Sequence, residues 1–384
     1  MKYKIRFNTK KSKIFLTFLF SLFIFMNCSI PYEKFLVESG SNKIEIENAI
    51  NNCPEQQEEG LRFLLENMPK RDLESLSAKF ILENLDYSYK ILNEVKWGKE
   101  IPTKIFLNYI LPYSNIHERR DNWRKDFYDK FFEYVKDAST PSEATLKLNE
   151  IIWDILSVKY STKRPKADQS PYETIEAGLA SCTGLSILFV DVCRAVGIPA
   201  RFVGIPLWKD KTGNHSWVEI WDNGWHYLGA AEVSELDKTW FTERAALADD
   251  SEWKHSIYAV SYKKTNMIFP PLFDSTATYI YADIITDRYN KEIRDNGKVQ
   301  LGVRVFKNKN RVNAKIKIFT DSSRSQPLFI GNSKNEEYDY NDFLTFNLEP
   351  NKTYLILASY NFERKSKVIK LNSNKYQLVE LNFN

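Results

Sequence analysis

Two stretches of the sequence decide the fold, SCTGLSILFVDVCRAVGIPARFV at residues 181–203 and NHSWVEIWDNGWHYLGAAE at residues 214–232. The first stretch runs from Ser181 through mostly apolar residues to Gly197-Ile198-Pro199. A glycine followed by a proline is typical of the end of a helix. This pattern predicts a buried helix with Cys182 at its N-terminus. The unpaired backbone N–H groups and the helix dipole favour a thiolate there, whereas Cys193, further along the helix, is predicted to be an inert core residue.

The second stretch predicts a β-hairpin. His215 begins a run in which apolar and polar residues alternate, and Asn223-Gly224 is typical of a two-residue type I′ loop. With that loop, His215 falls directly opposite Glu232 on the same face of the hairpin. A carboxylate beside the imidazole would orient the ring and complete a Cys-His-acid arrangement. A three-residue loop with a bulge would instead leave Glu232 diagonal to His215.

Cys182 heads a helix that ends in CRAVGIPARFV (193–203), and NHSWVEI (214–220) follows. This pattern resembles the core of the transglutaminase-like superfamily, which has a papain-like α+β fold and includes transglutaminases, bacterial thiol proteases and peptide N-glycanases. The resemblance covers residues 140–260. It implies that Cys182 is the nucleophile and His215 the general base.

The sequence departs from this family at the acid. Most members carry an Asp four residues after the Trp that starts the second strand, and that position is Gly229 here. Peptide N-glycanases often carry a Glu three residues further on, where this sequence has Glu232. Either Glu232 has taken over the role of the acid, as the predicted register favours, or the triad is incomplete and activity is weak or absent.

The implied chemistry is acyl transfer from a peptide, protein or glycopeptide amide through a Cys182 thioester. Backbone N–H groups near Cys182 would hold the oxyanion, and Gln169 is a candidate side-chain donor. Hydrolysis by a protease or amidase is favoured, because water is the default acceptor unless a site excludes it. The alternatives are a transglutaminase that cross-links glutamine side chains to amines, and a non-catalytic envelope module that binds peptide or glycan.

The flanking regions differ in their periodicity. Before the core, Asp72 is predicted to cap a helix, and Thr140 to cap another with Pro141 at its first position and Glu143 three residues after the cap. Beyond residue 273 the apolar period changes to two, which predicts an antiparallel β-sandwich. Residues 348–354 resemble the turn into a late strand of prealbumin-type sandwiches, which implies an immunoglobulin-like or prealbumin-like type. The predicted divisions are residues 1–27 (signal peptide), 28–140 (helical region), 141–272 (transglutaminase-like core) and 273–384 (β-sandwich).

The N-terminus carries the pattern of a bacterial export signal. Six Lys and Arg residues precede an apolar run at residues 14–26, which is too short for an ordinary spanning helix. Cys28 follows as the suspected lipidated residue of a lipoprotein signal, although Asn27 stands where such signals usually carry a small residue. We expect an exported protein of the cell envelope, in the periplasm or on the outer surface, that contacts the membrane only through this lipid. An uncleaved amphipathic anchor is the alternative.

Net charge, cysteine count and the lack of ligand motifs indicate which partners and cofactors are not expected. The formal net charge is +4, but removal of the six leader cations leaves 48 basic against 50 acidic residues, a net charge of about −2, so no nucleic-acid partner is expected. Four cysteines are too few for a disulfide-built scaffold. No metal is expected, because the histidines form no ligand pattern with nearby cysteines, and no cofactor, because the sequence has no P-loop or dinucleotide motif.

Overall fold

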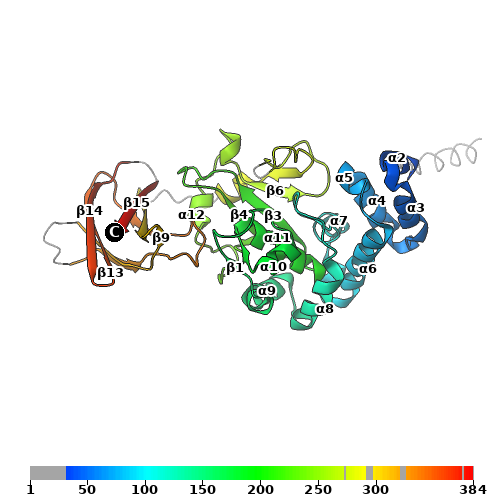
Figure 1. Cartoon of the computed structure of the whole chain (residues 1–384), viewed down its shortest axis with the longest axis horizontal. Helices are drawn as coiled ribbons and strands as arrows, with labels where there is room; N and C mark the ends of the chain where they lie inside the picture. The colour runs from blue at the N-terminus through cyan, green and yellow to red at the C-terminus, as the bar shows by residue number, and fades with distance from the viewer. Residues whose placement is uncertain (1–31, 272–273, 291–296, 321–325, 374–375, 384) are drawn as a thin grey trace, which may run out of the picture.

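The computed structural model describes residues 32–271, 274–290, 297–320, 326–373 and 376–383. The predicted leader and Cys28 lie outside the described residues. Figure 1 shows three parts in sequence along the long axis of the molecule: N-terminal helices at one end, a mixed core in the middle and β-sheets at the other end. Within the described ranges, no helix is both long and apolar enough to cross a bilayer.

The N-terminal part is helical, as predicted. Its helices are α2 (Tyr32–Glu38), α3 (Lys43–Asn52), α4 (Glu58–Asn67), α5 (Lys70–Leu73), α6 (Ala78–Glu94) and α7 (Thr103–Tyr109), with short 3₁₀ turns η1 (Gly40–Asn42), η2 (Glu55–Gln57) and η3 (Gly98–Glu100). They enclose a core of their own that includes Leu64, Ile81 and Leu85. The prediction that Asp72 caps a helix is wrong. Ser77 caps α6 instead, by accepting from the N–H of Phe80. The Asp72 carboxylate is buried and forms an ion pair with Arg120, so it is not used as a cap.

The central part is built around a five-stranded antiparallel sheet. In spatial order its strands are β5 (Trp225–Leu228), β4 (His215–Trp221), β3 (Ala200–Ile205), β6 (Tyr258–Ser261) and β7 (Tyr281–Ile284). A short parallel pair, β1 (Lys159–Tyr160) and β2 (Leu179–Ala180), lies beside it. The helices are α8 (Arg124–Val135), α9 (Pro141–Leu156), α10 (Pro171–Ala177), α11 (Cys182–Ala195), α12 (Thr242–Ala245) and α13 (Thr286–Asn290), with the 3₁₀ turn η4 (Trp253–His255).

Helix α11 is the centre of this part. Every residue from Thr183 to Ala195 is buried, and Leu188 and Val192 join a hydrophobic core with Ile152 of α9 and Val218 of β4. Thr140 caps α9 as predicted, accepting from the N–H of Glu143 at 3.1 Å. The mixed α+β core is thereby confirmed, with α11 held between helices and the sheet.

The β4–β5 hairpin differs from its predicted register. Trp221 pairs with Trp225, so the loop contains the three residues 222–224 rather than two. Within it Asn223 has a positive φ of 54°, whereas a type I′ loop needs positive φ at both central residues. Strand β5 ends at Leu228, so Glu232 does not pair with His215.

The C-terminal part consists of two sheets that share one core. One sheet has the order β11 (Phe329–Asn332), β10 (Lys315–Phe319), β13 (Thr353–Tyr360), β14 (Glu363–Lys370), and the other has β12 (Leu344–Leu348), β8 (Val299–Lys307), β15 (Tyr376–Phe383), with β9 (Asn310–Arg311) beside β8. Apolar residues of both sheets, such as Leu301 and Ile356, form one buried cluster. The pairing is antiparallel as predicted except that β15 runs parallel to β8.

Candidate active site

Cys182 is the first residue of α11, and the preceding residue holds it there. The Ser181 hydroxyl accepts from the N–H of Gly184 at 3.3 Å and donates to the carbonyl of Ala167 at 2.7 Å. An N-cap of this kind fixes the start of a helix, so Cys182 stands at the positive end of the α11 dipole. Cys193, in contrast, is fully buried in the core, as predicted.

Gln169, the candidate oxyanion donor, has another role. It is 1% exposed, and its side-chain N–H groups donate to the carbonyls of Glu173 and Leu179. Those bonds tie the loop before α10 to strand β2, which leads into Cys182. Gln169 therefore supports the segment that carries the thiol, and its donors are already used.

His215 begins strand β4 and is 2% exposed. Its ring lies among aromatic rings, with centroid distances of 4.8 Å to Trp240, 4.9 Å to Phe241 and 5.8 Å to Trp217. Burial lowers the pKa of His215 to about 3, and the nearby guanidinium of Arg244 lowers it further. The imidazole is therefore neutral, the form that can accept a proton.

The structure brings Cys182 and His215 together and adds a residue that the sequence did not indicate, Asp339. The thiol sulfur, one ring nitrogen and one carboxylate oxygen of these three residues lie within 4.8 Å of one another. The Asp339 Oδ2 atom is 3.8 Å from Nδ1 of His215. A hydroxyl contact of 3.1 Å between Thr183 and Ser216 also joins the start of α11 to strand β4.

Asp339 comes from the loop between β11 and β12, residues 333–343, which we call the inserted loop. The backbone N–H of Asn341 donates to Oδ1 of Asp339 at 2.7 Å, and the Asn341 side chain donates to the carbonyl of Asn214. The N–H of Tyr340 donates to the hydroxyl of Tyr160 in β1 at 2.8 Å. These contacts hold the inserted loop against both sides of the Cys182–His215 pair.

Burial dominates the electrostatics of this cluster. It raises the pKa of the Cys182 thiol well above its usual range, and the adjacent Asp339 carboxylate raises it further, while hydrogen bonding from the backbone of Ser216 and Thr183 opposes the shift. Burial also raises the pKa of Asp339. These shifts favour a protonated thiol and a neutral imidazole.

Asp339 does not stand where an orienting acid would stand. Such an acid bonds the imidazole nitrogen that faces away from the nucleophile. The Asp339 carboxylate instead lies within 4.8 Å of the Cys182 sulfur as well as of the ring. It therefore lies close to the Cys182 sulfur and to the imidazole together.

Glu232 lies beside Gly229, the position at which the family usually has its Asp. A Cβ atom built on Gly229 would fall 2.0 Å from Oε2 of Glu232, so the carboxylate fills the space of the missing side chain. Its Oε1 accepts from the indole N–H of Trp240 at 2.8 Å, and the Trp240 ring contacts His215. Burial raises the pKa of Glu232 to about 8.

The turn that carries Glu232 is held by Asn149 of α9. The Asn149 amide donates to the carbonyls of Gly229 and Glu232 and accepts from the N–H of Ala231 at 3.0 Å. Ala231 has a positive φ of 63°, which an alanine adopts only when its surroundings impose it. Helix α9 thus places the Glu232 carboxylate next to the β5 end.

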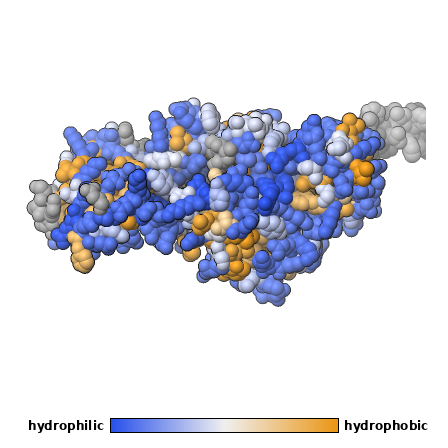
Figure 2. All heavy atoms as spheres, viewed as in Figure 1, coloured by the Kyte–Doolittle hydropathy of each residue, from blue (hydrophilic) through white to orange (hydrophobic). Residues whose placement is uncertain are grey.

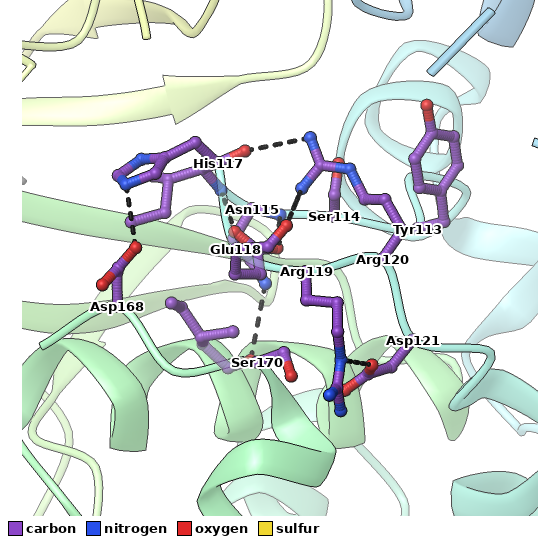
Figure 3. Close-up of polar contacts among 12 residues, drawn as sticks. Tyr113, Ser114, Asn115, His117, Glu118, Arg119, Arg120, Asp121, Asp168 and Ser170 are labelled. Carbon is purple, nitrogen blue, oxygen red and sulfur yellow. Dashed lines mark hydrogen bonds and ion pairs between the residues drawn. The ribbon is translucent and has the colours of Figure 1, made fainter. Parts of the chain in front are cut away.

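A second polar cluster lies between the N-terminal helices and the core, on the segment that joins α7 to α8 (Figure 3). His117 Nε2 lies 2.9 Å from the carboxylate of Asp168, and Glu118 accepts from the N–H groups of Asn115 and Ile116. Arg120 pairs with the buried Asp72. Glu118 and Arg120 thus have their partners within the chain, and the Arg120–Asp72 pair joins this segment to the N-terminal helices.

The only group of three or more potential metal ligands found in the described ranges is Cys182, His215 and Asp339. Sequence spacing could not indicate this group, because Asp339 lies in the inserted loop, which follows the core in the chain. In the sequence, Asp339 is marked only by its place in a loop with few apolar residues. Many surface aspartates share this feature.

A cysteine at a helix N-terminus that faces a histidine on a neighbouring strand is the arrangement of papain-like thiol enzymes. Residues 130–230, from α8 to just beyond β5, match the family model described as the transglutaminase-like superfamily, so this part of the chain is a transglutaminase-like core. The match includes Cys182, His215 and Gly229 but neither Glu232 nor Asp339. It confirms the resemblance found in the sequence.

Three solved structures are similar to parts of the chain. A proposed cysteine protease of Cytophaga hutchinsonii is 21% identical over 36% of this chain and 46% of its own, with a TM-score of 0.28. Red sea bream transglutaminase is 8% identical over 72% and 65%, with a TM-score of 0.36. A proposed protease of Parabacteroides distasonis is 9% identical over 64% and 38%, with a TM-score of 0.26. The chain spans less than two thirds of the length of each, and no curated protein matches it.

Proposed function

We propose that this protein is a thiol hydrolase that transfers the acyl group of a peptide or glycopeptide amide to water through a Cys182 thioester. The observation that carries the proposal is the approach of the Cys182 sulfur and a His215 ring nitrogen to within 4.8 Å at the N-terminus of α11. A neutral imidazole next to a thiol can take its proton as the thiol attacks a carbonyl.

The proposed reaction has two halves. In the first, Cys182 attacks the amide carbonyl, His215 takes the thiol proton and passes it to the leaving amine. In the second, His215 takes a proton from water as the water attacks the thioester, the acid is released, and His215 returns the proton to the Cys182 sulfur. The backbone N–H groups near Cys182, those of Thr183 and Ser216, are the donors proposed to stabilise the oxyanion.

We retain Glu232 as the proposed acid that supports His215, acting through Trp240. Its support is the carboxylate at the Gly229 position and the hydrogen bond from the Trp240 indole, whose ring contacts His215. Since Glu232 contacts the imidazole through another side chain, it is a positioning residue in this proposal. The alternative of an incomplete triad predicts that its replacement leaves the chemistry unchanged.

Cys182 is partly exposed, and the Asp339 carboxylate of the inserted loop lies within 4.8 Å of its sulfur. The loop is held there by Tyr160 and the backbone of Asn214. We therefore propose that the described arrangement is a closed state. Binding of a substrate, or release of the C-terminal sheets, would open it.

Thioester trapping with a peptide library tests the proposal, with intact-mass detection of the acylated chain. We expect a covalent adduct on Cys182 that decays in water, that is absent in Cys182→Ser and that forms at least about 100-fold more slowly in His215→Ala. Cys53→Ser is the matched control, because Cys53 is another free cysteine, outside the site. Adduct formation that is unaffected by Cys182→Ser would contradict the proposal.

Added primary amine separates hydrolysis from cross-linking. If the thioester decays at the same rate with and without amine and no amide product forms, the acceptor is water. Amide formation would favour a protein-glutamine transglutaminase instead, and the absence of any adduct from the opened protein would favour a binding module.

We also propose that the protein is exported and anchored in the cell envelope through Cys28. The support is the cationic segment and apolar run before that residue. Mass spectrometry of the mature N-terminus tests this, and a free N-terminus at another residue would contradict lipidation.

A further inference from the structure

The donor atoms of Cys182, His215 and Asp339 form a compact triangle. All lie within 4.8 Å of one another, and the nitrogen and oxygen are 3.8 Å apart. Zinc bonds of about 2.3 Å to sulfur and about 2.0–2.2 Å to nitrogen and oxygen place neighbouring ligands of a tetrahedron about 3.4–3.6 Å apart. Small side-chain adjustments would therefore bring the three atoms to the spacing of one face of a zinc tetrahedron.

These donors lack other partners. The Cys182 thiol and the Asp339 carboxylate share a side-chain hydrogen bond. Beyond this bond, the two ring nitrogens of His215 and Oδ2 of Asp339 have no hydrogen-bond partner within the described part of the chain, although the two residues are 2% and 7% exposed. Buried polar atoms nearly always have a partner. The sulfur, the ring nitrogen and the carboxylate oxygen are therefore positioned to donate electron pairs to one ligand.

The chemistry of the three groups selects the cation. A thiolate and an imidazole suit a borderline-soft ion such as zinc, whereas magnesium and calcium prefer a shell of oxygen atoms. One thiolate, one carboxylate and one neutral imidazole balance the charge of a divalent ion. A water molecule would complete the fourth position.

The surroundings support such a site. Oδ1 of Asp339 accepts from the N–H of Asn341 at 2.7 Å, which orients the carboxylate in the manner of an outer-shell bond. Aromatic rings of Trp208, Trp240 and Phe241 surround His215 and form a largely apolar wall, with the guanidinium of Arg244 4.7 Å from the Trp208 ring. An apolar wall strengthens the binding of a charged ion to its ligands, because it excludes competing water.

We propose that Cys182, His215 and Asp339 bind one zinc(II) ion, which joins the C-terminal sheets to the core and blocks the thiol. Binding replaces the thiol proton, and any proton on the carboxylate, with the metal, and it involves no change of oxidation state. While the sulfur is coordinated it cannot attack a carbonyl. The blocking effect rests on the proposed hydrolase function, whereas the metal site itself does not.

Cobalt(II) binding to the full, chelator-stripped chain tests the site directly. We expect one equivalent to produce the near-ultraviolet thiolate-to-cobalt charge-transfer absorption and the intense visible bands of a tetrahedral ion, and one equivalent of zinc to abolish both. Prior alkylation of Cys182 should prevent them, which requires no variant to fold. Absence of the charge-transfer absorption at stoichiometric cobalt would overturn the proposal.

Asp339→Asn and Asp342→Asn are the matched pair of variants. Both aspartates lie in the inserted loop and both are 7% exposed, but only Asp339 belongs to the triangle. Competition with a chromophoric chelator measures the zinc affinity of each variant. We expect this affinity to fall at least about 100-fold in Asp339→Asn and less than about 10-fold in Asp342→Asn. For comparison, the loss of an outer-shell contact typically lowers metal affinity about 10–100-fold. Equal losses in the two variants would overturn the assignment of Asp339 as a ligand.

Alkylation of Cys182 by iodoacetamide measures the blocking effect without any substrate. We expect zinc to slow labelling of Cys182 at least about tenfold, chelator to restore it, and labelling of Cys53 to remain constant in the same sample. Labelling that is insensitive to zinc would overturn the block. A failed hydrolase assay together with intact cobalt spectra would instead reject only the proposed function.

Discussion

The Asp339 carboxylate lies 3.8 Å from Nδ1 of His215, although Asp339 belongs to the C-terminal sheets and His215 begins a strand of the core. The inserted loop therefore reaches from the C-terminal sheets to the Cys182–His215 pair of the core. Figure 1 shows the C-terminal sheets beside the core, and the surface around them is largely hydrophilic (Figure 2). The proposed closed state predicts that access to Cys182 depends on how firmly the loop is held, which the first of the following changes tests.

Tyr160→Phe should loosen the inserted loop. It removes the hydroxyl that accepts from the N–H of Tyr340, a bond worth about 1 kcal/mol. In metal-free protein we expect iodoacetamide to label Cys182 roughly three- to tenfold faster, because a loss of about 1 kcal/mol raises the open population by about that factor. Tyr172→Phe removes a hydroxyl bonded to the carbonyl of Asn122 and serves as the control. Identical labelling rates in both variants would contradict the proposed closed state.

Glu232→Gln should change how stability depends on pH. Burial raises the pKa of Glu232 from 4.5 to about 8, with smaller contributions from Asp339 and Asp342, while the Trp240 indole and Lys334 act in the opposite direction. Between these two values the folded chain holds a proton that the unfolded chain has lost, so the free energy of unfolding falls as pH rises, by at most about 1.4 kcal/mol per pH unit.

The neutral glutamine has no proton to lose, so the variant should lose less stability than the wild type from pH 5 to pH 8. Urea unfolding at pH 5, 6, 7 and 8 measures the difference between the two curves. Glu235→Gln is the control, because that carboxylate is exposed and paired with Lys238. Parallel curves for wild type and Glu232→Gln would show that Glu232 is ionised in the folded chain.

Gly229→Asp should restore the usual acid of the family at the expense of stability. The new Cβ would lie 2.0 Å from Oε2 of Glu232, so we expect a loss of about 1–3 kcal/mol in urea unfolding. Adding Glu232→Ala should recover at least about 1 kcal/mol, since it vacates the shared space. Gly224→Asp, in the same hairpin with no atom near its Cβ position, is the control. Additive losses in the double variant would mean that the two side chains do not compete.

Asn149→Ala should destabilise the turn that carries Glu232. Asn149 is 3% exposed, and its removal leaves the carbonyls of Gly229 and Glu232 and the N–H of Ala231 without this partner. We expect a loss of about 2–4 kcal/mol, because buried polar groups lose their hydrogen bonds. Asn93→Ala, which removes an exposed bond to the carbonyl of Tyr89, should cost less than about 1 kcal/mol. Thermal unfolding of both variants compares them, and equal shifts would contradict the role of Asn149.

Local sequence patterns were sufficient for the elements of the core. The Ser181 cap, the apolar run of α11 and its Gly197 stop predict a helix that begins at Cys182, because capping and periodicity act over a few residues. The Thr140 cap of α9 was predicted for the same reason. Conversely, Asp72 carried a plausible cap signal, but its tertiary ion pair with Arg120 had no local trace.

Contacts between distant segments account for what the sequence could not reveal. The hairpin register depended on one residue in the loop, and the Glu232 carboxylate reached the Gly229 position through a turn held by Asn149. Asp339 meets Cys182 and His215 because the sheets fold back on the core, and no spacing rule connects residues so far apart in the chain. Residue types and local periodicity thus predicted the helix that begins at Cys182, the strand that begins at His215 and the class of fold. The long-range burial of polar side chains decided which carboxylates surround Cys182 and His215.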